Sequence, residues 1–137
     1  MRLPEDDARA RFAAARVARL ATADAKGRPH LVPVTFAVDG DDIYVAVDHK
    51  PKTTPALKRL SNIAENPQVS ALADRYDDDW DALWWVRGDG TARVIATDTA
   101  VALQLLTARY RQYRDNPPPG PVIAITVERW SGWAASS

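Results

Sequence analysis

The chain of 137 residues has no cysteine, which excludes disulfides, thiolate metal ligands and a cysteine nucleophile. It has no run of about 18 apolar residues, and its first residues, MRLPEDDARARF, lack the apolar segment of a signal peptide. Neither charge dominates: 18 Lys and Arg balance 18 Asp and Glu, without the basic excess of a general nucleic-acid binder. We therefore expect a cytoplasmic protein that binds neither membranes nor nucleic acid.

Most catalytic motifs are missing as well. There is no Gly-rich phosphate loop, no Walker motif, no Ser-His-Asp arrangement and no close carboxylate pair suited to acid–base work. The two histidines, His30 and His49, have no neighbours at metal-ligand spacing, and the acidic run at 77–81 lacks the glycine and glutamate of an EF-hand, so we expect no metal. If the protein is an enzyme, its chemistry belongs to a cofactor.

The length suits one domain spanning residues 1–137. Pro4 and the acidic residues after it predict a first helix, Thr54 and Pro55 begin a second, and Asp98 caps a third. Strands are expected at 17–23, 30–38, 43–47, 69–73, 83–87, 91–97 and 122–130, with hairpin turns at VDGDD and at Asp89–Gly90. Pro33 cannot donate to a ladder, so an edge or a bulge is expected near it. This order predicts a mainly β, antiparallel barrel with flanking helices.

The segment DHKPKTT, residues 48–54, joins a strand to a helix N-terminus. An extended loop would direct Lys50 and Lys52 to one side, and Thr53 and Thr54 add hydroxyl donors. Such a group of donors suits a phosphate or a carboxylate. The alternative is an ordinary polar turn with a Thr-Pro cap.

Tryptophan is the compositional oddity, with five residues against two phenylalanines. Trp84 and Trp85 are consecutive on a predicted strand and must face opposite sides, whereas Trp130 and Trp133 lie at or beyond the last strand. We expect part of this aromatic surface to be exposed to a partner subunit or a planar ligand.

Several stretches together resemble the pyridoxamine 5′-phosphate oxidase-like split β-barrel superfamily. They are GRPHLVPV, DGD, HKPK, NPQVS and the later GTARV, and the resemblance extends from Arg11 to Trp133. Within the superfamily the chain is most similar to the actinobacterial branch that uses the deazaflavin coenzyme F420. The resemblance implies a six- to seven-stranded, Greek-key-like antiparallel split barrel of obligate dimer type. The cofactor would lie in a groove between the two subunits of the homodimer.

The same resemblance implies site residues. Those expected to hold the cofactor phosphate are Lys50, Lys52, Thr53 and Thr54. Those expected to line its ring are Val32, Pro33, Val34 and Thr35. Lys58 and Arg75 are weaker candidates for its acidic tail, and lysines in place of the arginine-rich motif of the flavin enzymes favour the deazaflavin.

The implied reaction is hydride transfer from the reduced deazaflavin to a small electron-poor acceptor. Solvent, Tyr76 or His30 would supply the proton, and Trp85, with Trp130 or Trp133, would form a wall facing the substrate. Two alternatives stay open, a flavin mononucleotide enzyme of the same fold and a non-catalytic flavin- or haem-binding protein.

Overall fold

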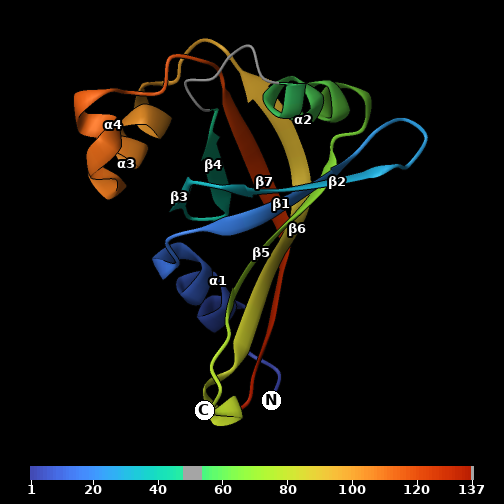
Figure 1. Cartoon of the computed structure of the whole chain (residues 1–137), viewed down its shortest axis with the longest axis vertical. Coiled ribbons are helices and arrows are strands. Elements are labelled where there is room, and N and C mark those ends of the chain that lie inside the picture. Colours follow the sequence, from blue (N-terminus) through green and yellow to red (C-terminus); the bar gives the residue numbers. More distant parts are fainter. Residues whose placement is uncertain (48–53, 137) are drawn as a thin grey trace.

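A computed structural model describes residues 1–47 and 54–136 of the chain. Seven strands form one antiparallel sheet in the order β2-β1-β5-β6-β7-β4-β3 (Figure 1). The strands are β1 (Ala18–Ala23), β2 (Pro29–Val34), β3 (Phe36–Asp39), β4 (Asp42–Ala46), β5 (Gln68–Arg75), β6 (Trp84–Ile95) and β7 (Val122–Ala134). The predicted mainly β, antiparallel split barrel with flanking helices is confirmed.

The two edges of this sheet are consecutive in the chain. β2 pairs with β1 at one edge and β3 pairs with β4 at the other, yet only Thr35 separates β2 from β3. The sheet must therefore curl until its edges meet at Thr35, and this meeting of the edges is called the seam below. The sequence predicted one strand over 30–38. That prediction was wrong, because the chain passes from one sheet edge to the other at Thr35.

The helices lie around the curled sheet. They are α1 (Glu5–Ala14), α2 (Thr54–Glu65), α3 (Ala100–Arg109) and α4 (Arg111–Asp115), with a 3₁₀ turn at Trp80–Ala82. α1 begins after Pro4 with three acidic residues in its first turn, which favour the positive end of the helix dipole. α2 lies at the end of the barrel where α3 and α4 are also found, and both termini lie at the opposite end (Figure 1). None of the described helices has both the length and the apolar composition of a membrane span.

The core fills the inside of the curl. Alternate residues of the strands point inward, as in β1, where Ala18, Leu20 and Thr22 are buried between more exposed neighbours. Phe12 of α1 meets Phe36 at 4.8 Å and Trp130 at 5.4 Å between ring centroids, so α1 closes one side of the core. A smaller cluster fixes α3 and α4 to β3 and β4 and consists of Ala37, Ala46, Leu106, Tyr110 and Tyr113.

The predicted hairpin at Asp89–Gly90 does not exist. β6 runs through both residues without turning and pairs with β7 along its whole length, with a register shift between Asp89 and Gly90. The glycines have another reason: a Cβ on Gly90 would lie 2.1 Å from the carbonyl oxygen of Thr126, and one on Gly88 would lie 3.2 Å from the Trp130 ring. Close approach of β7, and not a turn, requires glycine here.

Candidate functional site

The predicted ring-binding residues converge on the seam. A hollow of about 140 Å³, called the seam hollow below, opens where β2 ends and β3 begins. Pro33 is exposed, Thr35 is half-buried and Val34 is buried. The lining residues are Val17, Pro33, Val34, Thr35, Ala46 and Arg59. Three of the four predicted ring-lining residues therefore line one hollow, while the fourth, Val32, is half-buried farther along β2.

The seam is held by two tyrosines at the end of α3 and in α4. The Tyr113 hydroxyl lies 2.6 Å from Thr35 Oγ1, and the Phe36 amide donates to the Tyr110 hydroxyl at 3.1 Å. Tyr110 in turn donates to the Arg16 carbonyl at 3.0 Å. Both rings are 7% exposed, so their hydroxyl groups act in a largely water-free setting. The backbone around Thr35 is thus fixed by side chains about 75 residues later in the chain.

Arg109, the last residue of α3, contacts the residues that flank the seam. Its guanidinium donates to the carbonyls of Ala13 and Ala15 and lies 4.9 Å over the Phe36 ring. It also lies 5.4 Å over the Tyr110 ring. This arginine therefore connects α3 to the end of α1 and to the first residue of β3.

The residues predicted to bind the cofactor's phosphate and acidic tail are only partly described by the structure. Lys50, Lys52 and Thr53 lie outside the described residues, and Thr54 opens α2 with its side chain outside them too, so the predicted phosphate clamp stays a prediction. Lys58 is exposed on α2.

The sequence did not single out Arg59, which lines the seam hollow and is only 9% exposed. Helical spacing could have indicated it, because residues three and four apart lie on one face of a helix. Arg59, Asn62 and Ile63 have this spacing and share one buried face of α2.

His30 lies on β2, opposite Thr22 of β1. Its Nδ1 atom is covered and has no hydrogen-bond partner among the described residues. Nearby on the sheet, Thr22 accepts a hydrogen bond from the amide nitrogen of Asn62 at 3.0 Å. Tyr76, the other proposed proton donor, is 69% exposed and lies 3.5 Å from Trp80 Nε1. Neither side chain lines the seam hollow.

Arg75 and the tryptophans lie elsewhere. Arg75 pairs with Asp77 at 3.4 Å and lines a second hollow with Tyr76, Trp84, Trp85 and Trp133. Trp85 is half-buried and Trp133 is 40% exposed, as expected of an outer aromatic surface.

The expectation of an outward Trp130 was wrong. Trp130 is 5% exposed, packs against Phe12 and donates its indole N–H to Asp41 at 2.9 Å. It lies an odd number of residues from Trp133 on one strand and so faces the opposite side of the sheet.

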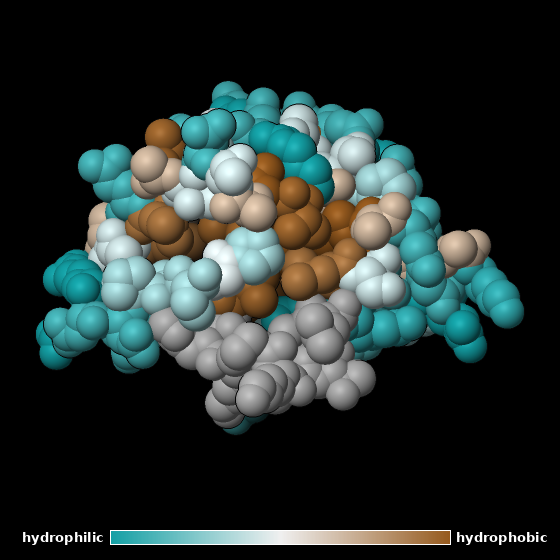
Figure 2. All heavy atoms as spheres, turned by 90° about the horizontal axis from the view of Figure 1, so that it is seen from above, coloured by the Kyte–Doolittle hydropathy of each residue, from teal (hydrophilic) through white to brown (hydrophobic). Residues whose placement is uncertain are grey.

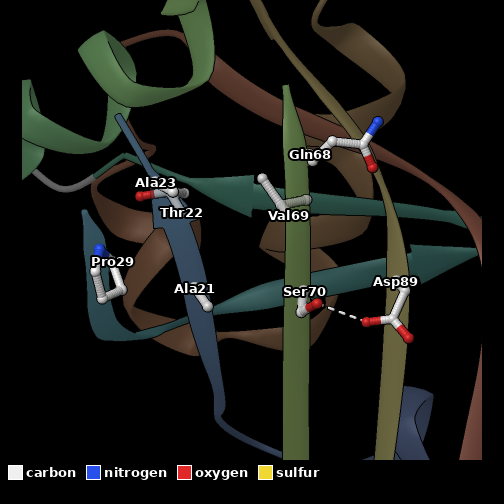
Figure 3. Close-up of a pocket in the computed structure, with 8 residues that line it drawn as sticks. All are labelled: Ala21, Thr22, Ala23, Pro29, Gln68, Val69, Ser70 and Asp89. Carbon is white, nitrogen blue, oxygen red and sulfur yellow. Dashed lines mark hydrogen bonds between the residues drawn. The ribbon is translucent and has the colours of Figure 1, made fainter. Parts of the chain in front are cut away.

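A larger hollow of about 400 Å³ lies across β1, β5 and β6 on the outer face of the sheet (Figure 3). Its one charged side chain, Asp89, accepts a hydrogen bond from Ser70 at 2.5 Å and another from Arg87 Nε at 3.1 Å. Of the predicted cofactor-binding residues whose side chains the structure describes, none lines it. With its carboxylate already paired, this hollow offers less to an anionic cofactor than the seam hollow does.

The end of the barrel that carries α2 and α3 has an apolar centre and a hydrophilic rim (Figure 2). An apolar centre of this kind suits the flat face of an aromatic ring better than it suits water.

Among the described residues, three ionisable groups have shifted pKa values. Hydrogen bonds from the indole of Trp130 and then from Arg9 lower the pKa of Asp41. Hydrogen bonds from the backbone and side chain of Arg28 lower the pKa of Asp24, which closes the turn between β1 and β2. Burial, followed by the charges of Asp42 and Asp39, raises the pKa of Tyr44. All three groups belong to the scaffold, since none lines the seam hollow.

Solved structures with the same fold include several binding proteins. An FAD-binding protein from Mesorhizobium loti is 22% identical, with a TM-score of 0.74 and coverage of 96% of this chain and 95% of that one. A conserved hypothetical protein from Mycobacterium tuberculosis is 23% identical, with a TM-score of 0.75 and coverage of 97% and 86%. The haem-storage protein of Vibrio cholerae is 19% identical, with a TM-score of 0.69 and coverage of 96% and 95%. No curated protein matches the sequence significantly.

A family model that covers nearly the whole chain identifies the family. The family model described as pyridoxamine 5′-phosphate oxidase matches residues 4–134, which include every described strand and the complete seam. The chain therefore belongs to the pyridoxamine 5′-phosphate oxidase family.

Proposed function

We propose that this protein is an oxidoreductase that uses the deazaflavin coenzyme F420 and holds it along the seam. The observation that carries the proposal is the convergence of Pro33, Val34 and Thr35 with the buried cation of Arg59 at one hollow. An apolar wall beside a guanidinium suits a planar ring that carries an anionic group. Family membership and the FAD-binding neighbour of the same fold support a cofactor of the flavin type.

The residues present fit such a cofactor. β2 is an edge strand, and an edge leaves backbone N–H and C=O groups unpaired, which the polar rim of a flavin-type ring can use. The seam hollow, at about 140 Å³, is smaller than the roughly 300 Å³ of a typical ligand pocket. The ring would therefore lie against the seam, with its other side covered by the second subunit of a homodimer.

Each residue then has a defined task. Val32, Pro33 and Val34 present an apolar edge to the ring, and Thr35 fixes its orientation because Tyr113 holds the Thr35 hydroxyl at 2.6 Å. When bound, the reduced deazaflavin would supply a hydride to an electron-poor acceptor. The group proposed to hold the cofactor phosphate consists of Lys50, Lys52, Thr53 and Thr54, with Lys58 toward the acidic tail.

Titration of the purified chain with coenzyme F420, flavin mononucleotide and FAD, followed by cofactor fluorescence, tests this function. We expect saturable binding of F420 and oxidation of reduced F420 in the presence of a quinone or nitro acceptor. Micromolar binding of flavin mononucleotide without binding of F420 would show that the protein is a flavin enzyme of the same fold.

Lys52→Ala tests the phosphate clamp. A charge-assisted hydrogen bond contributes about 1.5–3 kcal/mol, so cofactor affinity should fall by at least roughly tenfold. Lys26→Ala is the control, because Lys26 is exposed in the turn between β1 and β2. Equal affinities of the two variants would assign Lys52 to an ordinary turn.

A second candidate, a non-catalytic flavin- or haem-binding protein, is favoured by the fold of the haem-storage protein. Tight binding without turnover across a panel of acceptors would support it against the oxidoreductase.

Light scattering tests whether the cofactor groove lies between two subunits. We expect a molar mass of about twice the chain mass of 15.1 kDa, and a monomer would contradict a groove between subunits.

A further inference from the structure

Charged and aromatic side chains form two facing rows on the outer surface of β6 and β7. Residues two apart on a strand share a face. The cross-strand pairs on this face are Trp85 with Trp133, Arg87 with Ser131, and Asp89 with Arg129. The N-terminal segment joins them, because Arg2 forms a backbone bridge with Trp133.

These rows enclose a hollow of about 270 Å³, called the Arg–Trp hollow below. Its lining includes two indoles and three guanidiniums and, among the described residues, no carboxylate. The full lining is Arg2, Trp85, Arg87, Arg129, Ser131, Gly132 and Trp133. Asp89 compensates the charge of Arg87, so Arg2 and Arg129 leave a local positive charge although the chain as a whole is neutral.

Two of the three cations are available to a ligand. Arg87 already donates to Asp89 at 3.1 Å and lies 5.5 Å over the Trp85 ring. Arg2 and Arg129, by contrast, make no ion pair or side-chain hydrogen bond with any described residue. The Ser131 hydroxyl is covered and has no partner among the same residues. The guanidiniums of Arg2 and Arg129 are exposed and free to bind an anion, and the covered Ser131 hydroxyl beside them is a polar group that lacks a described partner.

We propose that the Arg–Trp hollow binds a planar aromatic anion, with its ring against Trp85 and Trp133 and its carboxylate or phosphate on Arg2 and Arg129. Indole faces attract flat rings, and the guanidinium fork matches two oxygens of a carboxylate or a phosphate. The anion binding stands on this geometry alone. It does not depend on the proposed function, because the Arg–Trp hollow lies by the termini and the seam hollow is lined by Arg59 of α2 at the other end of the barrel (Figure 1).

The probe is 1-naphthoate, and the uncharged 1-naphthamide is its matched control. Both are titrated into the ¹⁵N-labelled full chain, and the five indole N–H resonances are followed by NMR. Trp85→Phe and Trp133→Phe assign two of these resonances. We expect naphthoate to shift the resonances of Trp85 and Trp133 and to leave that of the buried Trp130 in place. Naphthamide should bind at least about fivefold more weakly, because it lacks the charge.

Arg129→Gln should weaken naphthoate binding by about fivefold or more, and Arg111→Gln should leave it unchanged. Arg111 is an equally exposed arginine in α4, at the opposite end of the barrel from the termini (Figure 1). Equal binding of the two probes, unchanged naphthoate affinity in Arg129→Gln, or no shift at Trp85 and Trp133 would overturn the proposal. Titration with coenzyme F420 is a separate measurement: naphthoate binding without F420 binding would contradict the proposed function and leave this proposal standing.

Discussion

Trp130 and Trp133 lie three residues apart on β7 and meet opposite environments. Trp130 packs on Phe12 inside the curl and gives its N–H to Asp41, whereas Trp133 is 40% exposed and lines two hollows on the outer face. The inner indole therefore serves stability, and the outer one is available to a ligand or a second subunit. The same residue type has two uses here because the two faces of one sheet have different surroundings.

The largest expected effect separates these two tryptophans. Trp130→Ala should lower the free energy of unfolding by about 3–5 kcal/mol, because it leaves a large cavity beside Phe12. Trp133→Ala should lower it by about 1–2 kcal/mol, since 40% of that residue's surface is already exposed to water. Urea denaturation of both variants measures the difference. Equal losses would show that the outer indole is structural.

Gly90 tests whether the inner face depends on close strand approach. A Cβ there would lie 2.1 Å from the Thr126 carbonyl oxygen, so Gly90→Ala must push β6 and β7 apart. We expect a loss of about 2–3 kcal/mol in urea denaturation. Gly120→Ala is the control, because its Cβ would meet Val47 at an ordinary 3.7 Å. A Gly90→Ala variant as stable as this control would contradict the reason given for the glycine.

Substitutions at the seam should lower the free energy of unfolding less than substitutions in the core. Tyr113→Phe removes the hydrogen bond to Thr35 and should cost about 0.5–1.5 kcal/mol of unfolding free energy. Under the proposed function it should also weaken cofactor binding, because Thr35 loses its fixed position. Tyr44→Phe is the control, since the Tyr44 hydroxyl has no hydrogen bond to a described residue. Unchanged cofactor affinity in Tyr113→Phe would separate the seam from the site.

The smallest expected effect is a pH dependence of stability that comes from Asp41, the hydrogen-bond partner of Trp130. Hydrogen bonds from Trp130 and Arg9 lower the pKa of Asp41 from its ordinary 3.8, so the folded state favours the carboxylate. Its contribution to stability is present above pH 3.8 and is lost as the pH falls through the lower folded pKa. Asp41→Asn should therefore be less stable than the parent chain at pH 7 and should approach it below about pH 3. A constant difference in unfolding free energy from pH 7 to pH 2.5 would rule out this linkage.

Local patterns predicted most elements. Pro4 and the acidic residues after it predicted the start of α1, and Thr54 and Pro55 predicted the start of α2. Val69 to Ala73 lies inside β5 as expected. These succeeded because caps, prolines and strand alternation act over a few residues.

Predictions from the sequence failed where contacts between segments far apart in the chain determine the structure. Asp89–Gly90 has the composition of a turn, yet β7 pairs through it and turns the glycine into a point of close approach. No local pattern singled out Arg59, because only the docking of α2 beside the seam buries it. The hydrogen bond of Tyr113 to Thr35 joins residues 78 positions apart, so no local pattern could indicate it.

By itself, the sequence determined the antiparallel, mainly β architecture, the family resemblance and the edge character of the strand that contains Pro33. Only the tertiary structure decided that the two sheet edges meet at Thr35, that Trp130 is inside, and that three arginines gather beside Trp85 and Trp133. The reason is physical: secondary structure follows from neighbours along the chain, whereas the curl of the sheet chooses which faces are buried. The same curl decides which residues meet at a site.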